Sequence, residues 1–450
     1  MSDTNKVKPN LENLQADIWP GLLKFYQIFY FFNIDDASKF KPQLKILANT
    51  VITSASRAQA MRNGILASKN APADMTTGPQ VVPLAGVNIA FSKVGLEKLG
   101  KDGLRDEAFN HGQFKSMTQG VKAGQDQEKD WLDSFKSGVD GVLLICGTKD
   151  KVEDRLKKLE DENLGPSHGL KVAEVLRGED LESRPGHEHF GFKDGISQPL
   201  LKGLDDAQAQ LPNKRHVLTD PGTIITGKDE PPWATDGSYM AFRKLKQFVP
   251  EFRSFVETNA PGLSYSPAQL GARLVGRWES GAPVQVFPTD DNPNEAEKND
   301  FDYTKDLQDK NCPFAAHIRK TKPRGDIGNL TDFDIMRRGI PYGKEFSGGE
   351  KKSTEDRGLL FVCYQSSLAK GFQFITESWI NEGTFRPPAA DVPVDPGIDP
   401  IMGSSGLNNM SIVDGKGARN SISFDSFVQS NGGEYFFMPS LPVLRDMATM

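Results

Sequence analysis

The stretch Phe25-Tyr-Gln-Ile-Phe-Tyr-Phe-Phe32 decides how the first part of this 450-residue chain folds. Aromatic and β-branched side chains fill it almost without interruption, which is typical of a strand buried inside a sheet. Further along the chain, Val87, Ile89 and Phe91 alternate with polar or smaller residues, and residues 142–146 form a continuous apolar run. Both patterns predict additional strands.

Two helical patterns and a fourth strand complete the order of the first part. Apolar residues at helical spacing predict a helix near 44–51 and a charged helix at 152–159, and residues 170–176 are interpreted as a strand. The order is therefore strand, helix, strand, strand, helix, strand, which is the ferredoxin-like motif.

A second, weaker copy of this pattern follows. Its expected strands lie at 239–243, 314–318, 359–364 and 435–438, and its expected helices at 248–258 and 368–380. Because 450 residues are too many for one core, we expect two domains, at 1–206 and 207–450. The predicted fold class is α+β, with two ferredoxin-like domains made of antiparallel sheets and peripheral helices.

Composition narrows the classes of partner. The formal net charge of −6 argues against nucleic acid, and no apolar run approaches the length needed to span a membrane. The first ten residues are polar and contain no signal-peptide core. The three cysteines, Cys146, Cys312 and Cys363, do not identify a redox compartment.

The stretch Gly191-Phe-Lys-Asp194-Gly195-Ile-Ser-Gln-Pro199 places an acidic residue beside glycine. Glycine adopts backbone conformations that other residues resist, so it can help to direct Asp194 into a space. Asp-Gly is also a frequent hairpin dipeptide, and from this stretch alone a simple turn is the favoured interpretation.

Two segments downstream point to chemistry: Cys312-Pro-Phe-Ala-Ala-His317-Ile-Arg-Lys-Thr-Lys-Pro-Arg324 and Arg337-Arg-Gly-Ile-Pro-Tyr342-Gly343. With residues 191–195, they resemble the dye-decolorizing peroxidases, a family of haem enzymes, and in particular its fungal members. That family carries a Gly-x-x-Asp-Gly signature and an axial histidine followed downstream by an arginine. The resemblance runs from about residue 8 to the C-terminus.

The resemblance implies a fold of the dimeric α+β barrel type and one haem b per chain. No Cys-x-x-Cys-His is present, so thioether links to the haem are not expected. The oxidant would be hydrogen peroxide, and the donors would be phenols, aromatic amines and bulky dyes, oxidised in one-electron steps. The resemblance also implies a secreted protein, and we expect a monomer.

On one face of the haem, the resemblance makes His317 the axial ligand and therefore the metal-binding residue. A neutral imidazole is a common ligand of haem iron, and its second nitrogen usually donates to a carboxylate. Asp399 matches the position of that carboxylate, although a loop aspartate before a proline is an equally simple interpretation. Arg319 and Arg324 are candidates for binding haem propionates, and solvated surface arginines are the alternative.

On the opposite face, Asp194 matches the family residue that moves the peroxide proton by general acid–base catalysis. Arg337 would stabilise the developing negative charge, and its neighbour Arg338 is a rival for this role. The family's Arg-x-x-x-Pro spacing selects Arg337.

Apolar and aromatic side chains complete the expected site. Leu359 and Phe361 lie two residues apart on one expected strand, and both match residues that line the family's distal pocket. Ile196 is expected to contact the haem as well. Tyr342 and Trp379 match aromatic residues that relay electrons from the surface in fungal members, although aromatic side chains more often only pack.

Two other functions remain open. A non-catalytic haem-binding or haem-delivery protein could use the same scaffold. Alternatively, His187 and His189 form a His-x-His pair that could bind a metal such as zinc, with Asp194 nearby, as in a metallohydrolase.

Overall fold

The computed structural model describes residues 8–69, 85–119, 126–214, 217–328, 331–390, 392–404 and 408–449. Its strands are β1 (Tyr26–Ile34), β2 (Gly86–Phe91), β3 (Gly141–Gly147), β4 (Leu170–Glu179), β5 (Ser238–Gln247), β6 (Met336–Arg337), β7 (Ile340–Tyr342), β8 (Gly358–Gln365), β9 (Asn409–Val413), β10 (Arg419–Ser423) and β11 (Val428–Met438).

The α-helices in the described ranges surround these strands. They are α1 (Ala37–Ile46), α2 (Ala55–Lys69), α3 (Lys93–Lys98), α4 (Glu107–His111), α5 (Gln113–Gln119), α6 (Asp133–Lys136), α7 (Lys149–Glu162), α8 (Asp206–Ala209), α9 (Pro221–Ile224), α10 (Val249–Asn259), α11 (Pro267–Val275), α12 (His317–Thr321), α13 (Phe372–Phe374) and α14 (Leu441–Met447). Two π-helical segments, Leu47–Val51 and Ile375–Ile380, continue α1 and α13.

Nine strands form one antiparallel sheet in the order β4-β1-β3-β2-β11-β5-β8-β6, with β7 also paired to β8. In the first half the strands lie in the order fourth, first, third, second along the chain (β4-β1-β3-β2). The second half has the same order, with β5 as its first strand and β11 as its last (β11-β5-β8-β6). The halves join where Phe91 of β2 pairs with Phe437 of β11. This confirms the predicted α+β class with antiparallel sheets and peripheral helices. Within the described residues the sheet stays open and does not close into a barrel.

The aromatic stretch that opens the chain lies at the centre of the first half. β1 lies between β3 and β4, so its backbone groups are paired on both sides. The rings of Phe29 and Phe31 lie 5.0 and 4.9 Å from that of Phe242 on β5. One hydrophobic core therefore runs through both halves of the sheet. The predicted boundary at residue 206 remains a prediction.

One strand of the second copy was predicted in the wrong place. Residues 314–318 do not pair in the sheet; they lead into α12, and the strands beside β8 are β6 and β7. Phe314, Ala315 and Ala316 are buried outside the nine-stranded sheet, and Ala315 packs in a cluster with residues of α10, α11, β9 and β10. A short apolar run does not by itself distinguish a strand from a buried turn that begins a helix.

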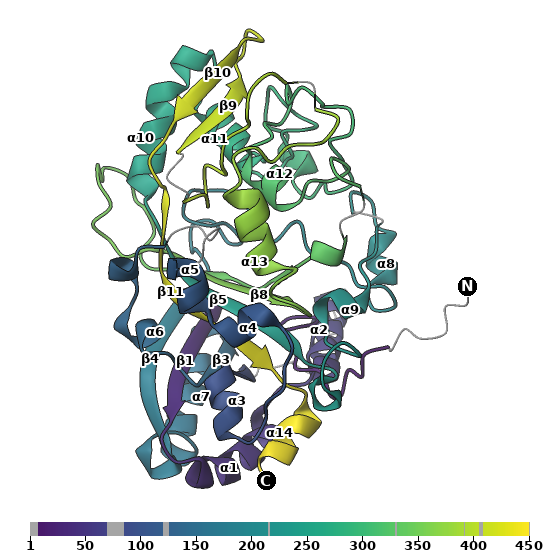
Figure 1. Ribbon diagram of the computed structural model, residues 1–450, viewed down its shortest axis with the longest axis vertical. Helices are drawn as coiled ribbons and strands as arrows, with labels where there is room; N and C mark the ends of the chain where they lie inside the picture. The colour runs from purple at the N-terminus through teal and green to yellow at the C-terminus, as the bar shows by residue number, and fades with distance from the viewer. Residues whose placement is uncertain are drawn as a thin grey trace.

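A layer of helices and loops covers one side of the second half. Figure 1 shows β1, β3 and β4 with α1 and α7 in the lower half of the molecule, and α10, α11 and α12 in the upper half. β5 and β8 cross the middle, and α13 stands above β8. The region between the sheet and α12 is where the expected haem-binding residues converge.

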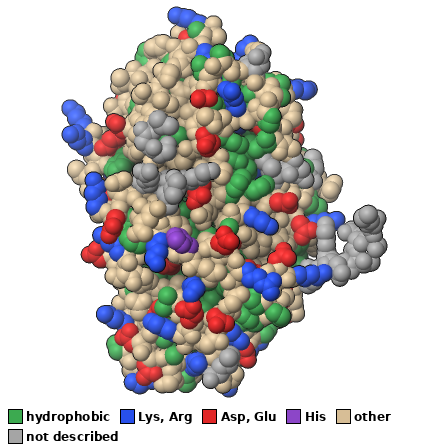
Figure 2. Space-filling model, in the orientation of Figure 1, with side chains coloured by type: hydrophobic (Ala, Val, Ile, Leu, Met, Phe, Trp, Pro, Cys, Tyr) green, Lys and Arg blue, Asp and Glu red, His purple; other side chains and the backbone are tan. Residues whose placement is uncertain are grey.

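Acidic and basic side chains are not segregated on the face of the molecule in view. Figure 2 shows basic and acidic side chains interspersed over it. In the part of the chain that the structure describes, no helix combines the length and apolar character needed to cross a membrane.

Candidate active site

A cavity of about 280 Å³ lies between the sheet and α12. Its walls come from β5, β8, the loop at 188–200, α12 and residues 401–404. The volume is close to the lower end of the range of about 300–1,000 Å³ for small-molecule pockets. Seven of the predicted residues line it together, namely Asp194, Ile196, His317, Arg324, Arg337, Leu359 and Phe361.

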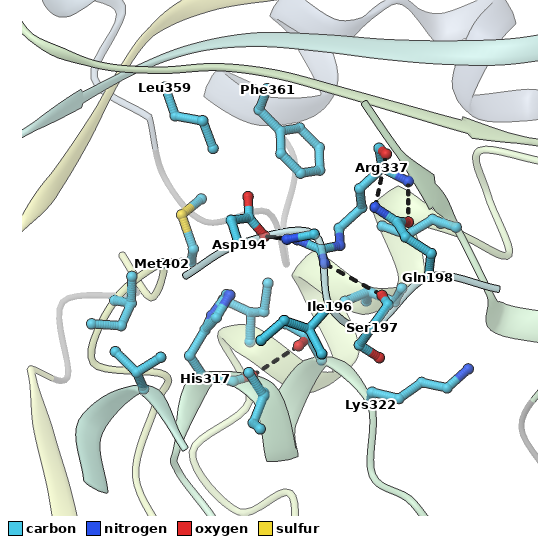
Figure 3. Close-up of a pocket in the computed structure, with 18 of the residues that line it drawn as sticks. Asp194, Ile196, Ser197, Gln198, His317, Lys322, Arg337, Leu359, Phe361 and Met402 are labelled. Carbon is cyan, nitrogen blue, oxygen red and sulfur yellow. Dashed lines mark hydrogen bonds and ion pairs between the residues drawn. The ribbon is translucent and has the colours of Figure 1, made fainter. Parts of the chain in front are cut away.

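Figure 3 shows how these residues face one another. Leu359 and Phe361 project from the strand above the cavity, and Asp194 and Arg337 lie below them. His317 rises from the opposite side. Leu359 and Phe361 share one face of β8 because side chains in a strand alternate between its two faces.

The loop that carries Asp194 depends on its glycines. Gly191 has φ 105° and Gly195 has φ 79°, a region that residues with a Cβ rarely occupy. Between them, the backbone N–H of Asp194 donates to the carbonyl of Gly186 at 2.9 Å. The Asp-Gly dipeptide does form a tight bend, and that bend presents the carboxylate to the cavity.

Asp194 and Arg337 form an ion pair at the cavity surface. Arg337 Nη1 donates to Asp194 Oδ1 at 2.7 Å, and the N–H of Gly195 donates to the same oxygen at 2.6 Å. The side-chain amide of Gln198 exchanges two hydrogen bonds with the backbone of Arg337. Arg337 is therefore held both at its backbone, by Gln198, and at its guanidinium, by Asp194.

The environment of Asp194 keeps it ionised. Its side chain is 39% exposed, but it lines the cavity, where burial still opposes ionisation. Arg337 and the N–H of Gly195 outweigh this burial and lower the pKa of Asp194 below its usual value.

The structure distinguishes Arg337 from its rival. Arg338 does not line the cavity, and its guanidinium donates to the carbonyls of Asp17 and Pro20. Adjacent residues in extended backbone point in opposite directions, so only one of the two arginines can face the cavity.

His317 is the first residue of α12, and Asp399 holds its ring. His317 Nδ1 lies 2.7 Å from Asp399 Oδ2, while the N–H groups of Ile401 and Met402 donate to Oδ1. Asp399 is fully buried. Burial lowers the pKa of His317, but Asp399 outweighs it and raises that pKa above its ordinary value. The carboxylate fixes the proton on Nδ1, which leaves Nε2 as the nitrogen able to bind a metal.

The donor set of the cavity fits a haem. Among the described residues, none hydrogen-bonds to His317 Nε2. Apolar side chains cover much of the remaining wall: Ile196, Ile318, Leu359, Phe361, Ile375, Ile380, Ile401 and Met402. One edge is basic, with Arg277, Lys322 and Arg324. An open imidazole nitrogen, apolar walls and a cationic edge match a flat apolar ring with an iron and two carboxylates.

The basic edge differs from the predicted one. Arg324 lines the cavity and donates to Ser197 Oγ and Asn299. Arg319 does not line it; its guanidinium is 1% exposed and paired with Asp306 and Asp326. We therefore correct the assignment of Arg319 to a haem propionate, because its donors are already bound to these carboxylates.

The two predicted relay aromatics lie near the cavity but do not line it. Tyr342 is 7% exposed and donates from its hydroxyl to Asp356 Oδ1 at 2.9 Å. Trp379 is 4% exposed and packs against the rings of Phe333, Phe374 and Phe385. Both side chains are therefore buried, although they match residues that relay electrons from the protein surface.

The His-x-His pair does not form a metal site. His187 Nδ1 contacts the carbonyl of Pro185, whereas His189 Nε2 contacts that of Tyr342, so the two rings serve different neighbours. Within the described ranges, no group of three or more His, Cys, Asp or Glu side chains could hold a metal ion. The metallohydrolase alternative therefore lacks a site in this part of the chain.

Several cavity residues were missed by sequence reasoning. They are Glu188, Gln198, Arg243, Gln247 and Arg277. Arg243 and Gln247 share the face of β5 with Leu245, so the alternation of that strand could have indicated them. No comparable signal exists for Arg277. It follows α11 and donates to two carbonyls and to Asn299, and its burial lowers its pKa to about 10.

Two family models match the chain. The model described as DyP dimeric alpha+beta barrel domain matches residues 13–179, and the one described as Dyp-type peroxidase, C-terminal, matches residues 274–385. The second match contains His317, Arg337, Leu359 and Phe361.

Similar proteins cover nearly the whole chain. A dye-decolorizing peroxidase of Exidia glandulosa is 36% identical over 467 residues, which are 97% of this chain and 86% of that protein. A crystal structure of a fungal DyP-type peroxidase from Auricularia auricula-judae has a TM-score of 0.83 at 34% identity and covers 98% of this chain and 100% of that one. A dye-decolorizing peroxidase solved in complex with 2,6-dimethoxyphenol has a TM-score of 0.85 at 36% identity, with coverage of 98% and 100%. This chain therefore belongs to the dye-decolorizing peroxidase family and is a peroxidase.

Proposed function

We propose that this peroxidase binds one haem b per chain, with His317 as its axial ligand, and uses hydrogen peroxide to oxidise phenols, aromatic amines and bulky dyes. When bound, the haem supplies the iron at which peroxide is reduced and the oxidising equivalents for two one-electron donor oxidations. The observation that carries this proposal is the placement of the Asp194–Arg337 pair across one cavity from an imidazole held by Asp399.

In this proposal Asp194 moves the proton of hydrogen peroxide. Its Oδ1 is bound by Arg337 and by the N–H of Gly195, whereas Oδ2 has no hydrogen-bond partner among the described residues. Oδ2 can therefore accept the peroxide proton and return it to the outer oxygen, which leaves as water. A group that is ionised before peroxide arrives is suited to the first of these transfers.

Arg337 contributes charge and orientation. Its planar guanidinium carries a positive charge, so it can stabilise negative charge on the peroxide oxygens. Nη2 also donates to the carbonyl of Ser197 at 3.3 Å, which limits rotation of the guanidinium. A fixed donor costs little reorganisation when the charge develops.

On the opposite side, His317 would hold the iron through Nε2. Asp399 fixes the ring orientation and increases electron donation from the imidazole. Arg324, with the neighbouring charge of Arg277, is the proposed partner of the haem propionates, because both guanidinium groups lie at the basic edge.

Large donors require a route from the surface. We propose Tyr342 and Trp379 as relay residues. Asp356, which accepts the hydrogen bond from Tyr342, has a side chain that is 59% exposed and can pass a phenolic proton to solvent. Trp379 follows the cavity-lining residues Ile375 and Thr376 in one π-helical segment and precedes Ile380.

Secretion, which rests on the family resemblance, and a monomeric state, which is our own expectation, complete the proposal. Fractionating a culture of the source organism into cells and medium would test the first. Measuring the molar mass of the purified protein in solution would test the second.

The central experiment is a visible spectrum of the purified protein before and after hydrogen peroxide, followed by a dye-decolorization assay. We expect a haem band, a rapid change of that band with peroxide, and its recovery when a dye or a phenol is added. A haem band that does not respond to peroxide would favour the haem-binding or haem-delivery alternative. A protein that cannot bind haem would overturn the proposal.

A further inference from the structure

Glu188 is another carboxyl group that lines the cavity, and no step described above uses it. Glu188 lines the cavity six residues before Asp194. Its Oε1 accepts from the N–H of Phe192 and its Oε2 from the N–H of Phe190, each at 2.9 Å. Oε2 also accepts from Gln247 Nε2. One side chain thus binds two backbone donors of its own loop and one side-chain donor of β5.

These contacts close the loop that ends at Asp194. The backbone of Glu188 adds two more bonds, since its N–H donates to the carbonyl of Phe192 and its carbonyl accepts from the N–H of Gly191. Residues 188–192 are therefore fixed by four hydrogen bonds to a single residue. Asp194 lies only two residues beyond Phe192, so the direction of its carboxylate depends on this closure.

Gln247 attaches the closed loop to the cavity wall. It is 5% exposed, and its strand contributes Arg243 and Leu245 to the same wall. Its Oε1 is buried without a hydrogen-bond partner among the described residues. A buried amide oxygen without a hydrogen-bond donor lowers the stability of the fold. This cost is removed if the oxygen gains a donor when Glu188 is protonated.

The pKa values of Glu188 and Asp194 are shifted in opposite directions. Burial raises the pKa of Glu188 to about 7, and the charge of Asp194 adds to that rise, whereas Arg337 lowers the pKa of Asp194. In acidic buffer Glu188 is therefore neutral while Asp194 stays ionised. A neutral Glu188 can donate its proton to Gln247 Oε1 after the amide reorients, so the loop keeps its attachment.

We propose that Glu188 is a positioning residue of the peroxide site: through Phe190, Phe192 and Gln247 it holds the loop that presents Asp194 to Arg337. This inference rests on the proposed role of Asp194 as the acid–base residue. The role belongs to the hydrogen bonds of Glu188 and requires no charge on its carboxyl group.

Two substitutions separate hydrogen bonding from charge. Glu188→Gln keeps the length of the side chain and one acceptor oxygen for the N–H of Phe192, and its amide can donate to Gln247 Oε1 but cannot accept from the N–H of Phe190. Glu188→Ala removes every side-chain contact. Because displacing a catalytic group by about 1 Å can cost on the order of a hundredfold in rate, we expect Glu188→Ala to react with peroxide ten- to a hundredfold more slowly. Glu188→Gln, which keeps the contacts with Phe192 and Gln247, should be slowed less than Glu188→Ala.

Hydrogen exchange supplies a readout that does not depend on the loaded enzyme. In the haem-free chain, the amides of Phe190 and Phe192 should exchange faster in Glu188→Ala than in the parent, and Glu188→Gln should restore the protection of Phe192. The pH profile of the peroxide reaction is a second readout. In Glu188→Ala its acid limb should move to higher pH, because a displaced Asp194 lies farther from Arg337. Uniform destabilisation of the fold would not move that limb.

The outcomes distinguish this inference from the proposed function. If Asp194→Asn is impaired while Glu188→Ala reacts as fast as the parent, only the role of Glu188 is overturned. If Asp194→Asn is itself unimpaired, the proposed function fails first. A Glu188→Gln variant as slow as Glu188→Ala would mean that the contacts with Phe192 and Gln247 contribute nothing, which also overturns the inference. If Glu188→Ala does not fold, Gln247→Leu takes its place, and unchanged peroxide kinetics in that variant would refute the inference.

Discussion

Replacing Arg337 by leucine tests whether the ion pair with Asp194 sets the pH range of the peroxide reaction. Arg337 Nη1 lies 2.7 Å from Asp194 Oδ1, and the substitution removes that charge without adding a polar group. The base form of Asp194 is the one that accepts a proton, so the reaction slows as pH falls through the pKa of Asp194. Without Arg337 that pKa rises, and the acid limb of the rate profile must move to higher pH.

The size of the shift follows from the geometry. Two unit charges about 4 Å apart interact by about 4 kcal/mol at an effective dielectric constant of about 20. At about 1.36 kcal/mol per unit, this corresponds to an upper bound of about three pKa units. The side chains of Arg337 and Asp194 are 29% and 39% exposed, which weakens the interaction. We therefore expect the acid limb to move up by about one to two pH units, within the usual effect of an arginine on an aspartate.

A second loss accompanies this shift. At pH values where Asp194 is ionised in both proteins, the leucine variant still lacks a donor to the peroxide oxygens. Removing one transition-state donor typically lowers the rate on the order of a hundredfold or more. At about pH 4 the two losses combine, since an unpaired aspartate with a pKa of about 3.9 is only half ionised there and burial raises its pKa further.

The assay is stopped-flow measurement of the haem-band change with peroxide from pH 3 to 8, in variants with matched haem content. Arg337→Lys is the control, because it keeps a positive charge without the planar fork and should shift the acid limb less than leucine does. If Arg337→Leu reacts more slowly but keeps the acid limb of the parent, the coupling to Asp194 is refuted. An unchanged rate at every pH would remove Arg337 from the mechanism altogether.

Three further predictions concern the other residues of the site. His317→Ala should lose haem or nearly all activity because it removes the open Nε2, and a variant with a normal haem spectrum and full turnover would contradict the axial assignment. Asp194→Asn should retain haem but react far more slowly with peroxide and lose the acid-side optimum, measured across pH 3 to 8; the parent's rate at every pH would place the base elsewhere. Trp379→Ser should lower turnover of bulky dyes while leaving small phenols and the peroxide step nearly unchanged, as steady-state assays with both donor classes can show. Equal losses for all donors would instead indicate a packing defect around the rings of Phe374 and Phe385.

Much of the fold was accessible from local patterns. The run at 25–32 predicted β1 because nearly every side chain in it is apolar and the strand is buried on both faces. The run at 314–318 misled because three buried apolar residues satisfy a strand and the start of a helix equally well. Only the pairing of β6 and β7 with β8, which is a tertiary contact, shows where the missing strand lies.

Some of the cavity residues could likewise be identified from the sequence, whereas others could be placed only by the tertiary structure. Sequence motifs identified Asp194, His317 and Arg337 by residue type and spacing, and the structure brings all three to one cavity. Arg319 and Arg324 are chemically identical, so motif and composition could not rank them. On α12, His317 and Thr321 are four residues apart and line the cavity together, whereas Arg319 lies two residues from His317 and points away.

By itself the sequence determined which groups are present: an imidazole, a carboxylate between glycines, an arginine beside a proline-containing strand, and two halves with the same order of elements. The tertiary structure alone decided which groups meet. It brought Asp399 to His317 across 82 residues and Arg337 to Asp194 across 143. It also decided the sign of the pKa shift of Asp194, because burial and a neighbouring charge act in opposite directions and only their distances show which is larger.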